Sequence, residues 1–350
     1  MSIKIITYYY TNNYGALLQS LCLKTFIENY VEEKIFYARY QPKKLMFSEI
    51  YRPLITKNLS KFSGVLIRNI KIRAWKKSLG LKKPIYKKNS ENEASTLSIF
   101  GSDEIWNYQN AYHGYEQYFF GEDNFSNKIS YAASFGRSKF DFLSTKQKDE
   151  IRYNLKNFKS ISVRDINSAH IIKKIMDIEP IIVVDPTLLS TPSILNDENK
   201  IVVNKKTNYA LVYGTVFSEE QRKIIKDYCK KRNYELYSIG YMNRWINKNY
   251  LSLDPTEFYQ IMKNSKIVFT SMFHGIMFSV KLKRNFWFSI DPIRQNKINH
   301  FINELNLQNR ELKTNIDLEK EIDYQNVYKI LDKWILKSKN FLISSIKEYL

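Results

Sequence analysis

Short apolar runs alternate along most of the chain with longer segments of helical spacing. Apolar runs of about four to eight residues, rich in β-branched and aromatic side chains, are typical of buried strands, and apolar residues three and four positions apart are typical of amphipathic helices. The predicted strands cover 3–9, 34–39, 97–100, 129–134, 160–163, 181–184, 209–214, 235–239, 266–271 and 285–290. The predicted helices cover 16–30, 166–176, 218–232, 255–263, 274–283 and 324–350.

A polar stretch divides this pattern into two blocks. Residues 190–208 hold Pro192 and several Asn, Asp and Glu residues, so they are predicted to be a linker. Repeated strand–helix–strand units favour parallel sheets with helices on both faces. The sequence therefore predicts an α/β protein with two doubly wound, Rossmann-like domains facing a cleft, at 1–192 and 205–322. The C-terminal helices, 323–350, are expected to pack back on the first domain.

Positive charge is concentrated in one segment. The formal net charge is +20, and residues 41–90 hold 14 Lys or Arg against one acidic residue, Glu49. Apolar residues at helical spacing, such as Leu66, Ile70 and Trp75, indicate a basic helical insertion in the N-terminal domain. Such a surface suits anionic lipid head groups, although a solvated face explains the same pattern. Nucleic acid is not expected as a partner, because no recognised binding motif accompanies the charge.

The sequence has the features expected of a cytoplasmic protein. No run approaches the roughly 20 apolar residues of a spanning helix, and the N-terminus is predicted to be a strand, not a signal peptide. The cysteines, Cys22 and Cys229, lie far apart in helical patterns and indicate neither a disulfide framework nor a zinc site. No cluster has the spacing of metal ligands, so no metal is expected. Lipid binding by the insertion would place the protein on the inner membrane face.

Candidate chemistry lies where predicted strands end, since ligands of doubly wound sheets bind at the carboxyl ends of the strands. After the first strand, Asn13, Tyr14 and Gly15 open a helix whose backbone N–H groups could hold an anion, or they form only a turn. Asp103 follows the third strand and could orient a sugar hydroxyl or act as a base. The alternative is that Ser102 or Asp103 caps a helix.

Arg164 and His274 follow later strands. The guanidinium of Arg164 could bind a carboxylate or phosphate, or it could pair with Asp165 at the surface. His274 starts a helix directly after an apolar strand, and histidine is the usual general acid or base near neutral pH. Structural roles are expected for the other histidines, His113, His170 and His300.

Taken in their order along the chain, these motifs resemble those of the polysaccharide pyruvyl transferase family. The resemblance covers nearly the whole chain and is carried by blocks at 13–16 with Gln19, 101–107, 131–136, 162–165, 184–189, 273–275 and 296–298 to 309–310. It implies a two-domain fold like that of the GT-B glycosyltransferases, with phosphoenolpyruvate as co-substrate and no cofactor. The implied product is a pyruvate ketal on two hydroxyls of a sugar in a cell-surface polysaccharide or its lipid-linked precursor.

The resemblance also implies roles for individual residues. His274 matches the family's histidine, and His274 and Asp103 are the expected catalytic residues, with Asp103 positioning the acceptor. Many members carry an arginine two positions earlier, where this chain has Met272, so another cation would hold the donor anion. The expected donor-binding residues are Arg164, Ser271, Gly275, Arg294 and Arg310. The expected acceptor-binding residues are Asn13, Tyr14, Gly15, Ser102, Trp106 and Asn107.

Two other functions stay open on the sequence alone. A glycosyltransferase with the same architecture would use a nucleotide sugar, because function resides in the site and not in the fold. A homologue that has lost catalysis together with the arginine would bind glycan without turnover. Binding of phosphoenolpyruvate, as opposed to a nucleoside diphosphate, distinguishes these functions.

Overall fold

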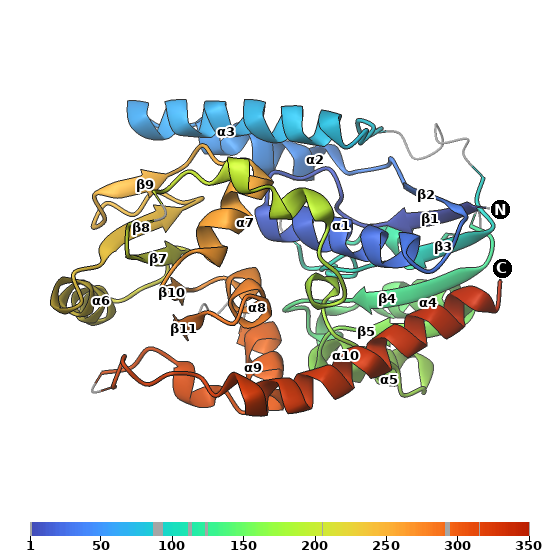
Figure 1. The fold of residues 1–350 in the computed structure, drawn as a ribbon. Helices are drawn as coiled ribbons and strands as arrows, with labels where there is room; N and C mark the ends of the chain where they lie inside the picture. Colours follow the sequence, from blue (N-terminus) through green and yellow to red (C-terminus); the bar gives the residue numbers. More distant parts are fainter. Residues whose placement is uncertain are drawn as a thin grey trace. The chain divides into compact units, whose positions relative to one another are not determined.

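Two parallel sheets organise the chain, and each belongs to its own compact unit. The computed structural model describes residues 2–86, 94–110, 114–122, 125–204, 206–290, 295–314 and 316–349. Unit 1 comprises Met1–Glu49, Lys82–Thr191 and Ile330–Leu350, and unit 2 comprises Ile50–Leu81 and Pro192–Lys329. Figure 1 shows both sheets with the helices that pack along them. The prediction of an α/β protein with two parallel sheets is confirmed.

Six parallel strands form the sheet of unit 1 within the described residues, in the order β2-β1-β3-β4-β5-β6. Their bounds are β1 Ser2–Ile6, β2 Lys34–Tyr37, β3 Leu97–Phe100, β4 Lys128–Ala133, β5 Phe158–Val163 and β6 Ile181–Ile182. Every residue of β3 and β4 is buried, as expected for parallel strands that are covered on both faces. The first strand, β1, lies inside the sheet and pairs with both β2 and β3.

Helices with well-defined caps connect the strands of unit 1. The longer ones are α1 Tyr14–Glu28, α4 Thr145–Lys156 and α5 Ile166–Met176, and α2 Lys43–Met46 is a single turn. Asn13 caps α1, Asp165 caps α5, and Ser144 forms a capping box with Gln147 at the start of α4. From Ile330 onward, helix α10, Tyr324–Lys347, belongs to unit 1. There the indole N–H of Trp334 donates to the carbonyl of Ile182 at 3.1 Å.

Unit 2 has a five-stranded parallel sheet in the order β11-β10-β7-β8-β9 within the described residues. Its strands are β7 Tyr209–Tyr213, β8 Glu235–Ile239, β9 Lys248–Tyr250, β10 Ile267–Thr270 and β11 Asn285–Phe288. Its helices are α3 Leu59–Ser78, α6 Glu219–Lys231, α7 Pro255–Lys263, α8 Phe273–Lys281 and α9 Gln295–Glu304. The first strand, β7, again lies inside the sheet, between β10 and β8.

The basic insertion predicted at 41–90 is divided between the units, and its main helix, α3, belongs to unit 2 instead of the N-terminal domain. The indole N–H of Trp75 donates to the hydroxyl of Thr256 at 2.9 Å, and the ammonium of Lys71 lies 2.9 Å from the carboxylate of Glu257. Both partners lie in the first turn of α7, so these contacts explain why α3 belongs to unit 2. Lys87 and Lys88, which the predicted insertion included, lie outside the described residues.

We expect Trp75 to be the main anchor of α3. Its side chain is 5% exposed and combines a large apolar surface with the hydrogen bond to Thr256. Replacement by alanine should therefore lower the free energy of unfolding by about 3–5 kcal/mol, measured by urea unfolding. The matched control is Phe62→Ala on the same helix, where the ring is 41% exposed and the expected change is within about 0.5 kcal/mol. Equal effects of the two changes would contradict this assignment.

Candidate functional site

The site residues of unit 1 lie at the switch point of its sheet. In the order β2-β1-β3, the chain leaves β1 toward one side and continues on the other side with β3, so the loops after β1 and β3 diverge. Ligands of doubly wound sheets bind in the crevice that such diverging loops leave at the carboxyl ends of the strands. Asp103 is the third residue after the end of β3 and therefore stands at this point. Its φ of 75° is in the left-handed region, which is uncommon for a residue other than glycine.

Ser102 holds the loops of this switch point together. Its backbone carbonyl accepts a hydrogen bond from the hydroxyl of Thr7 at 2.9 Å, and its own hydroxyl donates to the amide oxygen of Gln19. The side-chain nitrogen of Gln19 donates in turn to Thr7 and to the carbonyl of Ala16. Because Ser102 is fully buried and bonded within the protein, it shapes the loop instead of contacting an acceptor, contrary to the prediction.

Arg164 binds two carboxylates of its own unit. One guanidinium nitrogen, Nη1, lies 2.8 Å from Asp185 Oδ2, and Nη2 lies 3.1 Å from Asp103 Oδ1. Burial by itself would lower the pKa of Arg164, but Asp103 and Asp185 raise it, so the guanidinium stays charged. Its side chain is 2% exposed, whereas that of Asp103 is 13% exposed. Asp103 thus keeps part of its side chain accessible to solvent, whereas Arg164, which was predicted to bind the donor anion, binds Asp103 and Asp185 in the structure.

The alternative expectation for Arg164, a surface pair with Asp165, is also wrong. Asp165 is buried and caps α5, where its Oδ1 accepts from the backbone N–H and the hydroxyl of Ser168, each at 2.8 Å. Its Oδ2 accepts from the hydroxyl of Ser134 at 2.6 Å. Neighbouring residues in sequence therefore serve different contacts: Arg164 connects the loops after β3 and β6, and Asp165 connects those after β4 and β5.

We expect Arg164→Met to destabilise the protein strongly. The change leaves Asp103 and Asp185 without their shared cation in a buried position, and breaking a buried pair in this way typically costs about 3–5 kcal/mol. Lys146→Met is the control, because the Lys146–Glu150 pair lies at the surface and should contribute no more than about 1 kcal/mol. Urea unfolding of both variants measures the difference. A cost for Arg164→Met no larger than that of the control would exclude the buried network.

The remaining acceptor predictions divide by exposure. Trp106 is fully buried, donates its indole N–H to the carbonyl of Phe119 at 2.8 Å and stacks on Phe120, so it is a core residue and not an acceptor contact. Asn107 is 4% exposed. Its side-chain nitrogen donates to Glu104 Oε2, and its side-chain oxygen accepts from the hydroxyl of Ser138, each at 2.7 Å. The structure thus assigns loop-holding roles to both residues.

The turn before α1 has its own side-chain cap. Asn13 Oδ1 accepts from the backbone N–H groups of Gly15 at 3.0 Å and of Ala16 at 3.4 Å. These are the N–H groups that were expected to hold an anion, so Asn13 already occupies part of that position. Asn13 itself is exposed, whereas Tyr14 is 3% exposed and Gly15 is buried.

His274 lies at the switch point of unit 2. In the order β11-β10-β7-β8, the switch falls between β7 and β10, and two residues separate the end of β10 from the start of α8. His274 is the second residue of α8, is 9% exposed and packs edge-on against the ring of Phe273 at a centroid distance of 5.3 Å. An imidazole is thus positioned at the carboxyl end of the central strands and in the first turn of a helix.

Two glycines let the loops at this point approach closely. Gly214 follows β7 with a φ of 121°, and a Cβ there would lie 2.2 Å from the hydroxyl oxygen of Ser271. Gly275 lies in α8, where a Cβ would lie 2.1 Å from the hydroxyl oxygen of Thr270. Ser271 is fully buried and accepts from the backbone N–H of Val216 at 3.3 Å. Ser271 and Gly275, predicted to bind the donor, therefore shape the turn that presents His274, and sequence reasoning missed Gly214.

The arginines that were predicted to bind the donor, apart from Arg164, are Arg294 and Arg310. Arg310 is 2% exposed, donates to the carbonyl of Lys320 at 2.6 Å and lies over the ring of Trp287, and burial lowers its pKa, so its role is structural and not donor binding. Arg294 lies outside the described residues, as does His113. Lys297 on α9, which belongs to the block 296–298 but was assigned no role, has its ammonium 5.4 Å from the ring centroid of Phe273. It is therefore a cation beside the start of α8.

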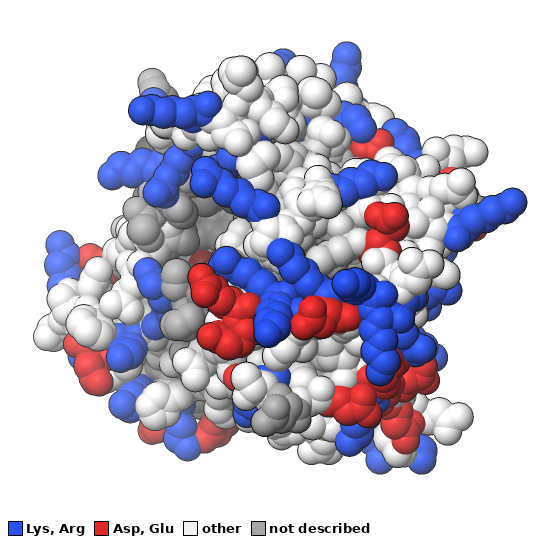
Figure 2. Space-filling view, turned by 90° about the vertical axis from the view of Figure 1, so that its left-hand side faces the viewer, with Lys and Arg blue, Asp and Glu red and all other residues white. Residues whose placement is uncertain are grey.

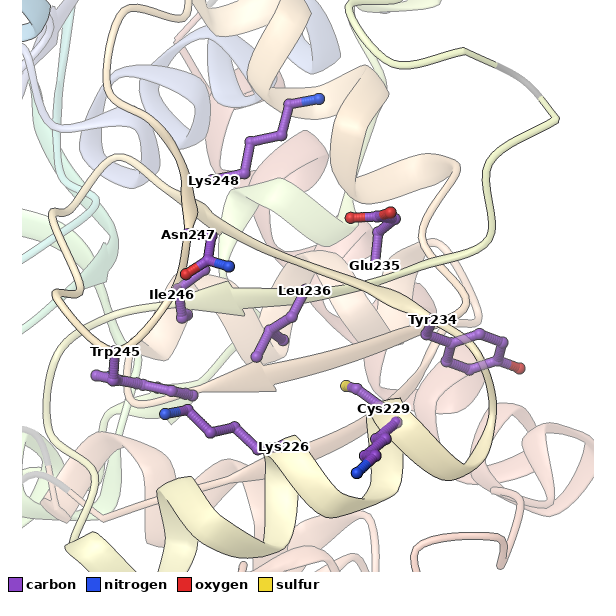
Figure 3. A pocket seen from close by; sticks show the side chains of 10 residues that line it. Lys226, Cys229, Tyr234, Glu235, Leu236, Trp245, Ile246, Asn247 and Lys248 are labelled. Atoms are coloured by element: carbon purple, nitrogen blue, oxygen red, sulfur yellow. The ribbon is translucent and has the colours of Figure 1, made fainter.

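A separate pocket of about 370 Å³ lies at the other end of the sheet of unit 2. Figure 3 shows its lining, which comes from the C-terminal part of α6, the start of β8 and the segment before β9. Lys226 lies 6.0 Å from the ring centroid of Trp245 at one side of the pocket, and Cys229 lines it although the residue is only 3% exposed. Because the pocket lies at the amino end of β8, it is distinct from the position of His274.

We expect the buried thiol of Cys229 to make the fold sensitive to alkaline pH. Burial raises its pKa from 9.0 to about 12. Between these values the unfolded chain loses the thiol proton and the folded chain retains it, so stability should fall by up to about 1.4 kcal/mol per pH unit. Urea unfolding of wild type and Cys229→Val measures this, since the other titrating groups are common to both. If the difference in the free energy of unfolding between wild type and Cys229→Val stays constant from pH 9 to pH 12, the expectation is contradicted.

No cluster of three or more His, Cys, Asp or Glu side chains that could hold a metal ion occurs among the described residues.

Two parallel sheets, each with polar groups at its switch point, define a two-unit α/β protein of the GT-B type. The sequence model of the family described as polysaccharide pyruvyl transferase matches residues 13–292, so the chain belongs to this family. No curated protein matches the chain significantly in sequence.

Solved structures of sugar-nucleotide enzymes are similar in fold. UDP-GlcNAc 2-epimerase from Neisseria meningitidis bound to UDP-GlcNAc matches with a TM-score of 0.50 and 8% identity, over 99% of each chain. The UDP-GlcNAc 2-epimerase from Methanocaldococcus jannaschii has a TM-score of 0.46 and 10% identity, over 96% of this chain and 93% of that one. The ADP-heptose lps heptosyltransferase II of E. coli has a TM-score of 0.40 and 14% identity, over 97% and 100%. At these identities the likeness concerns the fold alone.

Proposed function

We propose that the protein transfers the pyruvyl group of phosphoenolpyruvate to two hydroxyls of one sugar and forms a ketal. The sugar belongs to a cell-surface polysaccharide or its lipid-linked precursor. Membership of the polysaccharide pyruvyl transferase family supports the class of reaction. The observation that carries the proposal is the placement of His274 at the switch point of unit 2, in the first turn of α8. This is where a doubly wound sheet binds its ligand.

His274 acts as the general acid and base of the proposed reaction. It donates a proton to C3 of the enol, which leaves positive charge at C2. A first sugar hydroxyl bonds to C2 and returns its proton to the imidazole. The bond between C2 and the phosphate oxygen then breaks, phosphate leaves with the electron pair, and the second hydroxyl bonds to C2 while its proton passes to the phosphate. Phosphoenolpyruvate and a diol thus give a ketal and inorganic phosphate, with no change of oxidation state overall.

Lys297 holds the anionic donor in this proposal. Phosphoenolpyruvate carries a carboxylate and a phosphate, so cations and helix N-termini favour its binding. Met272, which stands where many relatives carry arginine, is 8% exposed and provides no charge. The ammonium of Lys297 lies against Phe273, the residue that precedes His274, and the first turn of α8 adds the positive end of a helix dipole. Lys297 therefore replaces the missing arginine.

Asp103 positions the acceptor. Its carboxylate is held from one side by Arg164, at 3.1 Å, and keeps 13% of its side chain exposed. A carboxylate in this state can accept a hydrogen bond from a sugar hydroxyl and orient its oxygen. Arg164 acts only through Asp103 and is a positioning residue.

Thermal unfolding with phosphoenolpyruvate, UDP and inorganic phosphate tests the choice of donor. Phosphoenolpyruvate at about 100 times its dissociation constant should add about 2.7 kcal/mol of stability, and UDP should add none. Lys297→Met should lose most of this stabilisation. A response to UDP alone would favour a glycosyltransferase that uses a nucleotide sugar, and no response to any of the three would overturn the assignment of the donor.

Release of phosphate from phosphoenolpyruvate, in the presence of a panel of oligosaccharide acceptors, tests the role of His274. We expect His274→Ala to lower the rate by roughly 10²–10⁴-fold while the stabilisation by phosphoenolpyruvate persists, because the change removes an acid–base group and not a charge partner. His170→Ala is the control, since His170 is exposed on α5. A folded and fully active His274→Ala protein would exclude the mechanism.

A further inference from the structure

Helix α3 presents large apolar side chains to solvent. Leu59 is 84% exposed, Phe62 and Leu66 are each 41% exposed, and Ile70 is 60% exposed. Spacings of three and four residues place these four side chains on one side of the helix. We call this set the apolar stripe. Ile55, just before the helix, is 74% exposed and extends the set.

The opposite side of α3 already has its partners. Val65, Ile72 and Trp75 are buried, and Lys71 and Trp75 contact the first turn of α7. Figure 1 shows α3 at the upper edge of the view, and the exposures above show that its outer side is uncovered. The helix is therefore apolar on two sides, and only one of them packs into unit 2. An ordinary surface helix has charged and polar residues on its outer side.

The chain segment that carries the stripe has charges of one sign. Residues 50–86 contain ten Lys or Arg and no Asp or Glu. Arg73 and Lys77 continue the line of the stripe by one turn each and are exposed, and Lys57 is exposed just before the helix begins. In Figure 2 Lys and Arg predominate in the upper part of the view, whereas both signs of charge are mixed in its middle and lower parts. A partner of the stripe must therefore combine an apolar interior with negative charge at its surface.

We propose that the apolar stripe of α3 docks on an anionic lipid bilayer, with the helix lying in the plane of the interface. The stripe would enter the boundary between head groups and acyl chains, while Arg73 and Lys77 pair with lipid phosphates. A second copy of the chain is disfavoured as partner, since stripe-to-stripe packing would bring two uniformly basic segments together. A spanning role does not apply, because none of the helices in the described part of the chain has the length and apolarity to cross a bilayer.

Docking on lipid does not depend on the proposed transferase activity, and it is measured without substrate. The test is co-sedimentation with vesicles of phosphatidylcholine alone and of phosphatidylcholine mixed with equal parts of phosphatidylglycerol. We expect binding to the anionic vesicles, weakened by salt, and little binding to the neutral ones. Leu66→Ser/Ile70→Ser should weaken the partition coefficient about tenfold or more, because apolar area is lost from the inserted face. Arg73→Gln/Lys77→Gln should weaken it about fivefold for each charge removed.

Matched controls lie on α10, which is also long and amphipathic. Ile330→Ser/Leu336→Ser removes one Ile and one Leu that are 36% and 59% exposed, and Lys333→Gln/Lys337→Gln removes two exposed lysines with the same spacing. Neither pair should change vesicle binding. Thermal unfolding of every variant checks that it folds, and since the replaced side chains are exposed we expect melting temperatures close to wild type.

A tryptophan in the stripe gives a second measurement that does not depend on the strength of binding. Compared with wild type, whose five tryptophans already emit, Phe62→Trp should show additional emission that shifts to the blue with anionic vesicles and is quenched by lipids brominated in the acyl chain. Equal effects of the α3 and α10 changes, or no quenching in Phe62→Trp, would overturn the proposal. Dimerisation in the absence of lipid that the stripe changes abolish would also overturn it and identify a second copy as the partner.

Discussion

The position of the first strand of each sheet, inside the sheet instead of at its edge, is the constraint on which the structure depends. Because β1 and β7 are flanked on both sides, the chain must leave in one direction and return in the other. The loops at the carboxyl ends then diverge and leave an opening that side chains do not fill by default. Asp103 and His274 both lie at these switch points, after β3 and β10. Two unrelated stretches of sequence thus acquire equivalent places by topology alone.

Most of the polar groups described around these switch points form hydrogen bonds or ion pairs within the protein. Arg164 joins Asp103 to Asp185, Ser102 joins the loops after β1 and β3, and Ser271 joins those after β7 and β10. Buried polar groups must be bonded, and a loop between buried strands satisfies them with its neighbours. Asp103, whose side chain keeps 13% of its surface exposed, is the group of this network that the proposed function assigns to the acceptor. Rigid surroundings suit a reaction that depends on orientation.

Helix α3 differs from these loops, because one of its sides is bonded to the protein and the other exposes apolar side chains. Trp75 and Lys71 attach one side of it to α7 in unit 2. The other side leaves Leu59 and Ile70 in water, at a cost that a soluble surface would normally avoid. A membrane partner gives this arrangement a physical reason, and an acceptor linked to lipid would bring the proposed reaction to the same surface.

The alternation of apolar runs and helical spacing determined the α/β class, most of the strands and the division near 190–208, since periodicity is a local property. It also placed Asp103 and His274 at strand ends, and collinear motifs determined the family. The short polar strand β9, Lys248–Tyr250, was not predicted from the sequence, because it has no apolar run. Helix α4 was also not predicted, although Ser144 and Gln147 indicate its capping box. Only the tertiary structure decided that Arg164 meets Asp185, that Trp106 is buried and that α3 belongs to unit 2. These facts depend on which distant segments meet, and a pattern along the chain carries no information about a partner that folding alone brings within hydrogen-bond distance.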